Sequence, residues 1–201
     1  MFAVLSGRKS REGGRRPGRK QVYERKALIR LLIYIGTILL TAAAGYWFVC
    51  GFATKEAVMD DSMEPTLQSE DIVLVNKAAY KVGKSDSMDV ALIRIGQSGS
   101  GPVYIRRIVG VPGDTVKITD GKLYVNDEQV ELPGNGDAIE EAGAAGTGVE
   151  LGDDEYFVLC DNYNGSTDDS RLDSIGTVSA DQIIGKIWFR TSPASSIGGI
   201  H

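Results

Sequence analysis

The residues best suited to chemistry are a serine and its neighbours, in the stretch Asp60-Asp61-Ser62-Met63-Glu64-Pro65-Thr66-Leu67. A proline fixes its own φ and disfavours helical backbone at the residue before it, so we expect Ser62 in an extended or turn segment. Its hydroxyl could act as a nucleophile if another group removed its proton. Taken alone, a serine beside a proline is more often an ordinary turn residue.

The group that would remove this proton is not expected to be a histidine. The only histidine is His201, the last residue, and a chain end is a poor place for an imidazole held by two partners. The same argument disfavours a histidine-based zinc site, and we expect neither a metal nor a cofactor. The alternative base is a lysine, buried so that its neutral form is populated near pH 7.

Two further stretches contain unusual combinations of residues. They are Tyr104-Ile105-Arg106-Arg107-Ile108-Val109-Gly110-Val111-Pro112-Gly113-Asp114 and Asp161-Asn162-Tyr163-Asn164-Gly165-Ser166-Thr167-Asp168-Asp169-Ser170-Arg171. Together with the stretch around Ser62, in this order behind an apolar segment, they resemble the motifs of the type I signal peptidase family. Gly185-Lys186 near the end also fits, so the resemblance extends from the apolar segment to about Phe189.

The resemblance implies a fold, a reaction and a set of site residues. Members of the family have a β-rich catalytic body and cut signal peptides from exported preproteins after small residues. A serine, here Ser62, attacks the scissile carbonyl while a deprotonated lysine takes its proton. The substrate lies extended along strand edges. By this resemblance the substrate contacts are Met63, Pro65, Tyr104 and Ile105, although Met63 could equally pack internally or contact lipid.

The sequence departs from the family at the position of the base, where the family's lysine is replaced by Arg106. A guanidinium is effectively never deprotonated in proteins, so Arg106 is not expected to take the proton of Ser62. It could orient a substrate or stabilise negative charge. Nothing in the sequence places another lysine beside Ser62. The alternative bases are therefore simply the lysines present in the body, namely Lys77, Lys81, Lys84 and Lys117.

Further departures lie close to the serine. Asp60 stands where the family has a serine that helps to stabilise the oxyanion, and a carboxylate there would oppose the developing charge. Asp61 and Cys160 replace usual glycines. We hypothesise that Asp60 and Arg106 form an ion pair, because pairing offsets much of the cost of a buried charge. The double change Asp60→Ser with Arg106→Lys should then be tolerated better than either single change.

The third stretch allows several interpretations. It is one residue longer than usual, so either Ser166 or Thr167 could stand where the family has a supporting hydroxyl. Asp169 and Arg171 could support the site or simply form a buried structural ion pair. A calcium loop is disfavoured because Tyr163 occupies a ligand position.

Charge and hydropathy predict how the chain is anchored. The first 31 residues contain ten Lys/Arg and two Glu, a net charge of +8, whereas the rest has 12 Lys/Arg and 25 Asp/Glu, a net of −13. The uncharged stretch 31–54 is long enough to cross a bilayer. We therefore predict a cytoplasmic tail at 1–27, a transmembrane anchor at 28–54 and an extracytoplasmic domain at 55–201.

The alternative for the apolar stretch is a cleavable signal peptide, because Ala42-Ala43-Ala44 looks like a cleavage site. Nucleic acid is not an expected partner, because the acidic body would repel phosphates.

The body is predicted to be mainly β. Apolar runs or alternating residues predict strands at 71–75, 89–95, 103–109, 156–159 and 182–189, and a hairpin at 115–125 around Asp120-Gly121. Residues 55–61 should join the anchor to the body, 96–101 should form a turn, and 133–149 should be a loop or short helix. Two cysteines, Cys50 and Cys160, do not indicate a disulfide framework.

Two functions remain open from the sequence. The first is a membrane-bound serine endopeptidase that processes exported preproteins. The second is a catalytically impaired relative that binds segments of exported proteins or pilin subunits as an assembly chaperone. The second explains why the departures cluster at the chemical positions while the framing positions match.

Overall fold

The structure is a computed structural model that describes residues 19–82, 86–96, 101–134 and 136–200. It divides into two units, Met1–Phe48 and Val49–His201. The first described element, helix α1, spans Arg19–Phe52, and its segment Leu28–Tyr46 is long and apolar enough to cross a membrane. No residue of that segment is buried, which fits a candidate membrane span.

The anchor at 28–54 stays a prediction, and helix α1 is a longer element that contains most of it. Helix α1 begins at Arg19, inside the stretch assigned to the tail, because Arg, Lys, Gln and Glu are good helix formers. The helix also ends at Phe52 rather than Thr54, since strand β1 occupies Ala53–Ala57. The segment predicted to be a connection therefore starts with a strand that pairs with β2.

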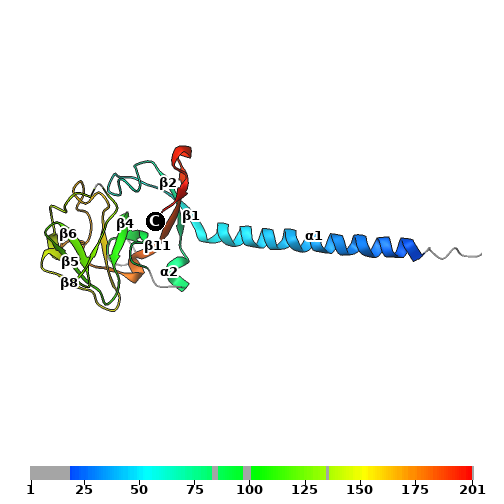
Figure 1. The fold of residues 1–201 in the computed structure, drawn as a ribbon, viewed down its shortest axis with the longest axis horizontal. Helices are drawn as coiled ribbons and strands as arrows, with labels where there is room; N and C mark the ends of the chain where they lie inside the picture. Colours follow the sequence, from blue (N-terminus) through cyan, green and yellow to red (C-terminus); the bar gives the residue numbers. More distant parts are fainter. Residues whose placement is uncertain (1–18, 83–85, 97–100, 135, 201) are drawn as a thin grey trace, which may run out of the picture. The chain divides into compact units, whose positions relative to one another are not determined.

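The body is built on two antiparallel sheets (Figure 1). The larger sheet has the order β1-β2-β11-β3-β4-β9-β10, and β12 pairs with β11. Besides β1 its strands are β2 (Ile72–Asn76), β3 (Val90–Arg94), β4 (Val103–Gly110), β9 (Glu155–Leu159), β10 (Val178–Ser179), β11 (Ile183–Ser192) and β12 (Gly198–Gly199). The mainly β fold is thus confirmed.

The smaller sheet has the order β7-β6-β5-β8. Its strands are β5 (Thr115–Thr119), β6 (Lys122–Val125), β7 (Glu128–Val130) and β8 (Val149–Glu150). The predicted hairpin at 115–125 is present, and Asp120 and Gly121 at its turn both have positive φ. Short helices complete the body: α2 (Ala79–Val82), η2 (Gly143–Gly146), η3 (Ala180–Gln182) and η4 (Ala194–Ser196).

Strand β4 is the element that links the two halves of the body. It lies between β3 and β9 in the larger sheet, and its last six residues are buried. Val109 packs in the cluster under the smaller sheet, whereas Ile105 packs in the cluster that contains Met63 and Leu67. Because one strand contributes to both clusters, the side chains that β4 presents between them are held firmly in place. Residues 97–100 of the turn predicted before β4 lie outside the described residues.

Candidate active site

Ser62 lies in a turn between β1 and β2, as the Glu-Pro pair after it predicted. The turn is closed by the hydrogen bond from Leu67 N to Met63 O, and Met63 and Leu67 are fully buried. Asn162 fixes the other side, since its backbone N–H donates to Ser62 O and its side chain donates to Asp61 O. The first and third sequence motifs are therefore joined directly through the backbone of the serine.

Arg106 reaches the same place from the middle of β4. Its Nη1 donates a hydrogen bond of 2.7 Å to Ser62 Oγ, and its Nε donates one of 2.7 Å to Asp168 O. The guanidinium carbon lies 4.9 Å from the centre of the Tyr104 ring, which stacks beneath it from the same face of the strand. The side chain at the position of the family's base is therefore buried, 1% exposed, and in contact with the serine hydroxyl.

Asp60 completes a row of three polar side chains. Ser62 Oγ donates to Asp60 Oδ1 at 2.5 Å, and the same oxygen accepts a hydrogen bond of 3.2 Å from Ser62 N. The direct ion pair hypothesised between Asp60 and Arg106 is not among the ion pairs of the described residues. The two groups are instead joined through the serine hydroxyl, which stands between the carboxylate and the guanidinium.

The positive charge of Arg106 is incompletely paired. Its Nη2 is buried and has no hydrogen-bond partner among the described residues. The acceptors on Nε and Nη1 are main-chain carbonyls and the Ser62 hydroxyl, none of which carries a full charge. A buried cation without a bound carboxylate is costly, so its field is available to negative charge that forms on or near Ser62.

Arg107, the next residue, has a different role. Its Nε and Nη2 bind the two carboxylate oxygens of Asp161, each at 2.7 Å, and its Nη1 donates to Met88 O. Thr66 Oγ1 donates to the same carboxylate at 2.5 Å. Both charged side chains are fully buried. This fork-to-fork pair fixes the three sequence motifs relative to one another, and sequence reasoning missed it although all three residues lie in the quoted stretches.

The third motif is folded around Arg171. Its guanidinium binds both oxygens of Asp169 and three backbone carbonyls, those of Glu141, Tyr163 and Ser166. Asp169 also accepts a hydrogen bond from Cys160 N. All of these contacts order the loop, which favours the structural interpretation of the Asp169–Arg171 pair over a direct part in chemistry.

The two candidate hydroxyls do not hold Arg106. Ser166 Oγ accepts from the Cys160 thiol, at 3.6 Å, and from Asp168 N at 3.5 Å. In the described part of the chain, Thr167 makes no side-chain hydrogen bond to Arg106, and the guanidinium is held instead by the Asp168 carbonyl. Burial raises the pKa of the Cys160 thiol to about 12, with the nearby Arg106 charge acting in the opposite direction.

The four predicted substrate contacts differ in accessibility. Pro65 is exposed and Tyr104 is half-buried, whereas Met63 and Ile105 belong to the core cluster beneath the serine turn. A ligand could therefore reach Pro65 and Tyr104 directly, and the contact role of all four stays a prediction. Among the suggested alternative bases, Lys77 and Lys117 are exposed, and the side chains of Lys81 and Lys84 lie outside those described.

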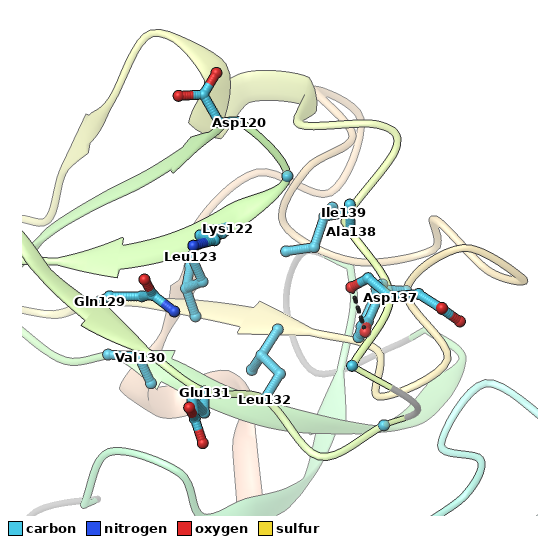
Figure 2. A pocket seen from close by; sticks show the side chains of 14 residues that line it. Asp120, Lys122, Leu123, Gln129, Val130, Glu131, Leu132, Asp137, Ala138 and Ile139 are labelled. Carbon is cyan, nitrogen blue, oxygen red and sulfur yellow. Dashed lines mark hydrogen bonds between the residues drawn. The ribbon is translucent and has the colours of Figure 1, made fainter.

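A separate hollow of about 440 Å³ lies in the smaller sheet (Figure 2). Its walls come from β6, β7 and the segment that follows them, with Leu123, Leu132 and Ile139 pointing into it. Tyr163 also lines the hollow and donates a hydrogen bond to Asp137 O. Neither Ser62 nor Arg106 lines this hollow, so it is distinct from the candidate site.

Comparisons with known proteins match this chain to one family. A family model described as signal peptidase, peptidase S26, matches residues 28–192. The chain belongs to this family of signal peptidases. It is 31% identical over 168 residues to signal peptidase I U of Bacillus subtilis (strain 168), a match that covers 81% of this chain and 87% of that protein. It is also 31% identical over 167 residues to signal peptidase IB of Staphylococcus aureus (strain COL), covering 74% and 83%.

A solved signal peptidase I from Enterococcus faecalis V583 is a more partial match. It is 24% identical, covers 52% of this chain and 97% of that chain, and has a TM-score of 0.42. Family membership, which the three motifs predicted, is confirmed by the family match and the Bacillus relative. Serine peptidase chemistry on substrates that carry signal peptides is thus the general function of the family to which this member belongs.

Proposed function

We propose that this signal peptidase relative is a membrane-anchored serine endopeptidase, and that Ser62 is the nucleophile that cleaves signal peptides from exported preproteins. The observation that carries this proposal is the position of the Ser62 hydroxyl. It donates to the Asp60 carboxylate and accepts from the Arg106 guanidinium. A hydroxyl polarised from both sides in this way is suited to lose its proton as it attacks a carbonyl.

The proposal includes a topology. The N-terminal stretch is strongly basic, so it should stay in the cytoplasm while the body lies on the outer face of the membrane. Protease added to intact cells should then degrade the body and leave the N-terminal segment protected. Degradation of the body only after the cells are opened would contradict this orientation.

A second function is favoured by one specific observation, the identity of the residue beside Ser62. Arg106 cannot accept a proton, so a site that depended on residue 106 as its base would bind without cutting. Such a protein would hold extended segments of exported proteins or pilin subunits during assembly. The contacts of Pro65 and Tyr104 with a peptide would be retained, because they need no base.

A cleavage assay separates the two functions. The full chain would be reconstituted in lipid with a preprotein, beside Ser62→Ala and the matched control Ser195→Ala at an exposed serine. Cleavage by the native chain and Ser195→Ala, but not by Ser62→Ala, is the expected result. Binding of the preprotein without cleavage by any of the three would favour the assembly function instead.

The variant Arg106→Lys adds a third comparison. If Arg106→Lys cuts and the native chain does not, the site lacks only its base, and the natural protein is a binder. If the native chain already cuts, a proton acceptor other than residue 106 must serve Ser62.

A further inference from the structure

The hydroxyl of Ser62 has two hydrogen-bond partners of opposite charge in the described part of the chain. Its Oγ lies 2.5 Å from Asp60 Oδ1 and 2.7 Å from Arg106 Nη1. A guanidinium can only donate and an ionised carboxylate can only accept, so residue type fixes the direction of both hydrogen bonds. The proton of the hydroxyl therefore already points at a carboxylate oxygen.

We propose that Asp60 is the proton acceptor for Ser62, and that Arg106 is a fixed cation that stabilises the negative charge formed during attack. The inference rests on the proposed function, because it supplies the base which that function requires. It also gives one explanation for two departures from the family, the aspartate in place of a serine and the arginine in place of the lysine.

The charges of such a site balance. In a serine–lysine site, proton transfer turns a neutral amine into a cation beside the new oxyanion. Here the cation is present from the start, and transfer of the proton to Asp60 neutralises the carboxylate that contacts the serine. Both routes reach the same state, one positive group beside one oxyanion. The expected repulsion between Asp60 and the oxyanion is thus removed by the step that creates the oxyanion.

The reaction can be written with each atom accounted for. Ser62 Oγ forms a bond to the scissile carbonyl carbon, its proton moves to Asp60 Oδ1, and the carbonyl π electrons become the oxyanion. The C–N bond then breaks as the oxyanion collapses, and the leaving amine takes the proton from Asp60. Water then attacks the carbonyl carbon of the resulting ester while Asp60 accepts its proton. The bond between that carbon and Ser62 Oγ breaks, Asp60 returns the proton to Ser62 Oγ, and the peptide acid leaves.

A purely structural role for Asp60 would produce one of the same contacts. Its Oδ1 also accepts a hydrogen bond from Ser62 N, which is a common local turn motif for aspartate and asparagine. Asparagine can keep this turn, because its side-chain carbonyl accepts the same hydrogen bonds, but it cannot take up a proton at neutral pH. The substitution Asp60→Asn therefore separates the two roles.

The experiment measures single-turnover cleavage by the full chain in lipid. The substrate is an internally quenched peptide with alanines at the first and third positions before the scissile bond, and its affinity is measured separately by fluorescence anisotropy. The variants are Asp60→Asn, Ser62→Ala and the matched control Asp61→Asn, which changes the neighbouring exposed carboxylate. The double variant Asp60→Ser with Arg106→Lys recreates a serine–lysine site.

We expect Asp60→Asn to slow cleavage by about 10²–10⁴-fold with unchanged affinity, the usual contribution of a general base. Asp61→Asn should cut like the native chain, and the double variant should recover activity relative to Asp60→Asn. Native-like cleavage by Asp60→Asn would overturn the role of Asp60 while leaving Ser62 as the nucleophile. Absence of Ser62-dependent cleavage in the native chain would overturn the proposed function, and the inference with it.

Discussion

At the scale of single residues, the buried pair of Arg107 and Asp161 is expected to contribute strongly to stability. Both side chains are fully buried, and each nitrogen–oxygen distance in the fork is 2.7 Å. Asp161→Asn should destabilise the fold by about 3–5 kcal/mol, because it leaves the Arg107 charge buried and unpaired. Thermal unfolding followed by circular dichroism would measure the change.

The matched control for this change is Asp120→Asn. Asp120 is exposed at the tip of the β5–β6 hairpin with φ of 52°, a conformation that asparagine also tolerates. The melting temperature of Asp120→Asn should stay close to that of the native chain. Equal melting temperatures for the two variants would show that the Arg107–Asp161 pair does not hold the motifs together.

Cys160 gives a second residue-scale prediction, on pH. Burial raises the pKa of its thiol from 9.0 to about 12, so the unfolded chain ionises there first as pH rises. The stability contributed by the neutral thiol is fully present below pH 9 and is lost between pH 9 and about 12. The slope cannot exceed about 1.4 kcal/mol per pH unit.

Burial also raises the pKa of Tyr80, so its hydroxyl contributes to the same pH dependence. Comparison of the native chain with Cys160→Ala isolates the contribution of the thiol. Denaturant unfolding at pH 8, 9 and 10 should show a shallower decline in stability for Cys160→Ala than for the native chain. If stability declined equally in the two proteins, the Cys160 thiol would not be buried from water as it is in the structure.

Sequence reasoning identified which residues gather at the site but not how they contact one another. The motifs named Asp60, Ser62 and Arg106, yet the side chain of Asp60 binds the serine hydroxyl rather than the guanidinium. Asp60 is two positions before Ser62, and from there its carboxylate could contact either the serine hydroxyl or the Arg106 guanidinium. The backbone conformation of the turn decides which contact forms. Arg107 and Asp161 are 54 positions apart, so their pairing depends on the register of β4 against β9.

At the scale of elements, the predicted strands are those with a clear pattern of apolar residues. Strand β4 has such a pattern, whereas β1 has the sequence ATKEA and was missed. Strand β1 forms because it pairs along its whole length with β2, a tertiary effect that local propensity does not contain. The short strands β7, β8, β10 and β12 were missed for the same reason.

Helix η2 shows how one element supports the third motif. Its first residue, Gly143, has φ of +52°, and a Cβ added there would lie 2.3 Å from Arg171 O. Ala144 N donates a hydrogen bond of 3.0 Å to the same carbonyl. Gly143→Ala should therefore destabilise the fold through both backbone strain and a clash that forces η2 away from Arg171.

Gly148→Ala is the matched control, because Gly148 has φ of +87° but open space around the added Cβ. Strain alone should cost about 1–2 kcal/mol in either variant, and the clash should add about 1–3 kcal/mol in Gly143→Ala only. Thermal melts would measure the difference. If the control lowered the melting temperature as much, η2 would not be packed tightly on the third motif.

At the scale of the whole molecule, the core clusters formed by the described side chains contain none from before Val58. Helix α1 has its apolar side chains exposed from Leu28 to Tyr46, as expected for a segment surrounded by lipid.

A chain that starts at Val49 should thus keep the strand signal in circular dichroism and melt within a few degrees of the full chain. The shortened chain should no longer bind lipid vesicles, because a helix needs about 20 apolar residues to span a bilayer and the truncation removes them. A truncated chain that is unfolded would show that the helix stabilises the body, and one that still binds vesicles would show a second membrane contact in the body.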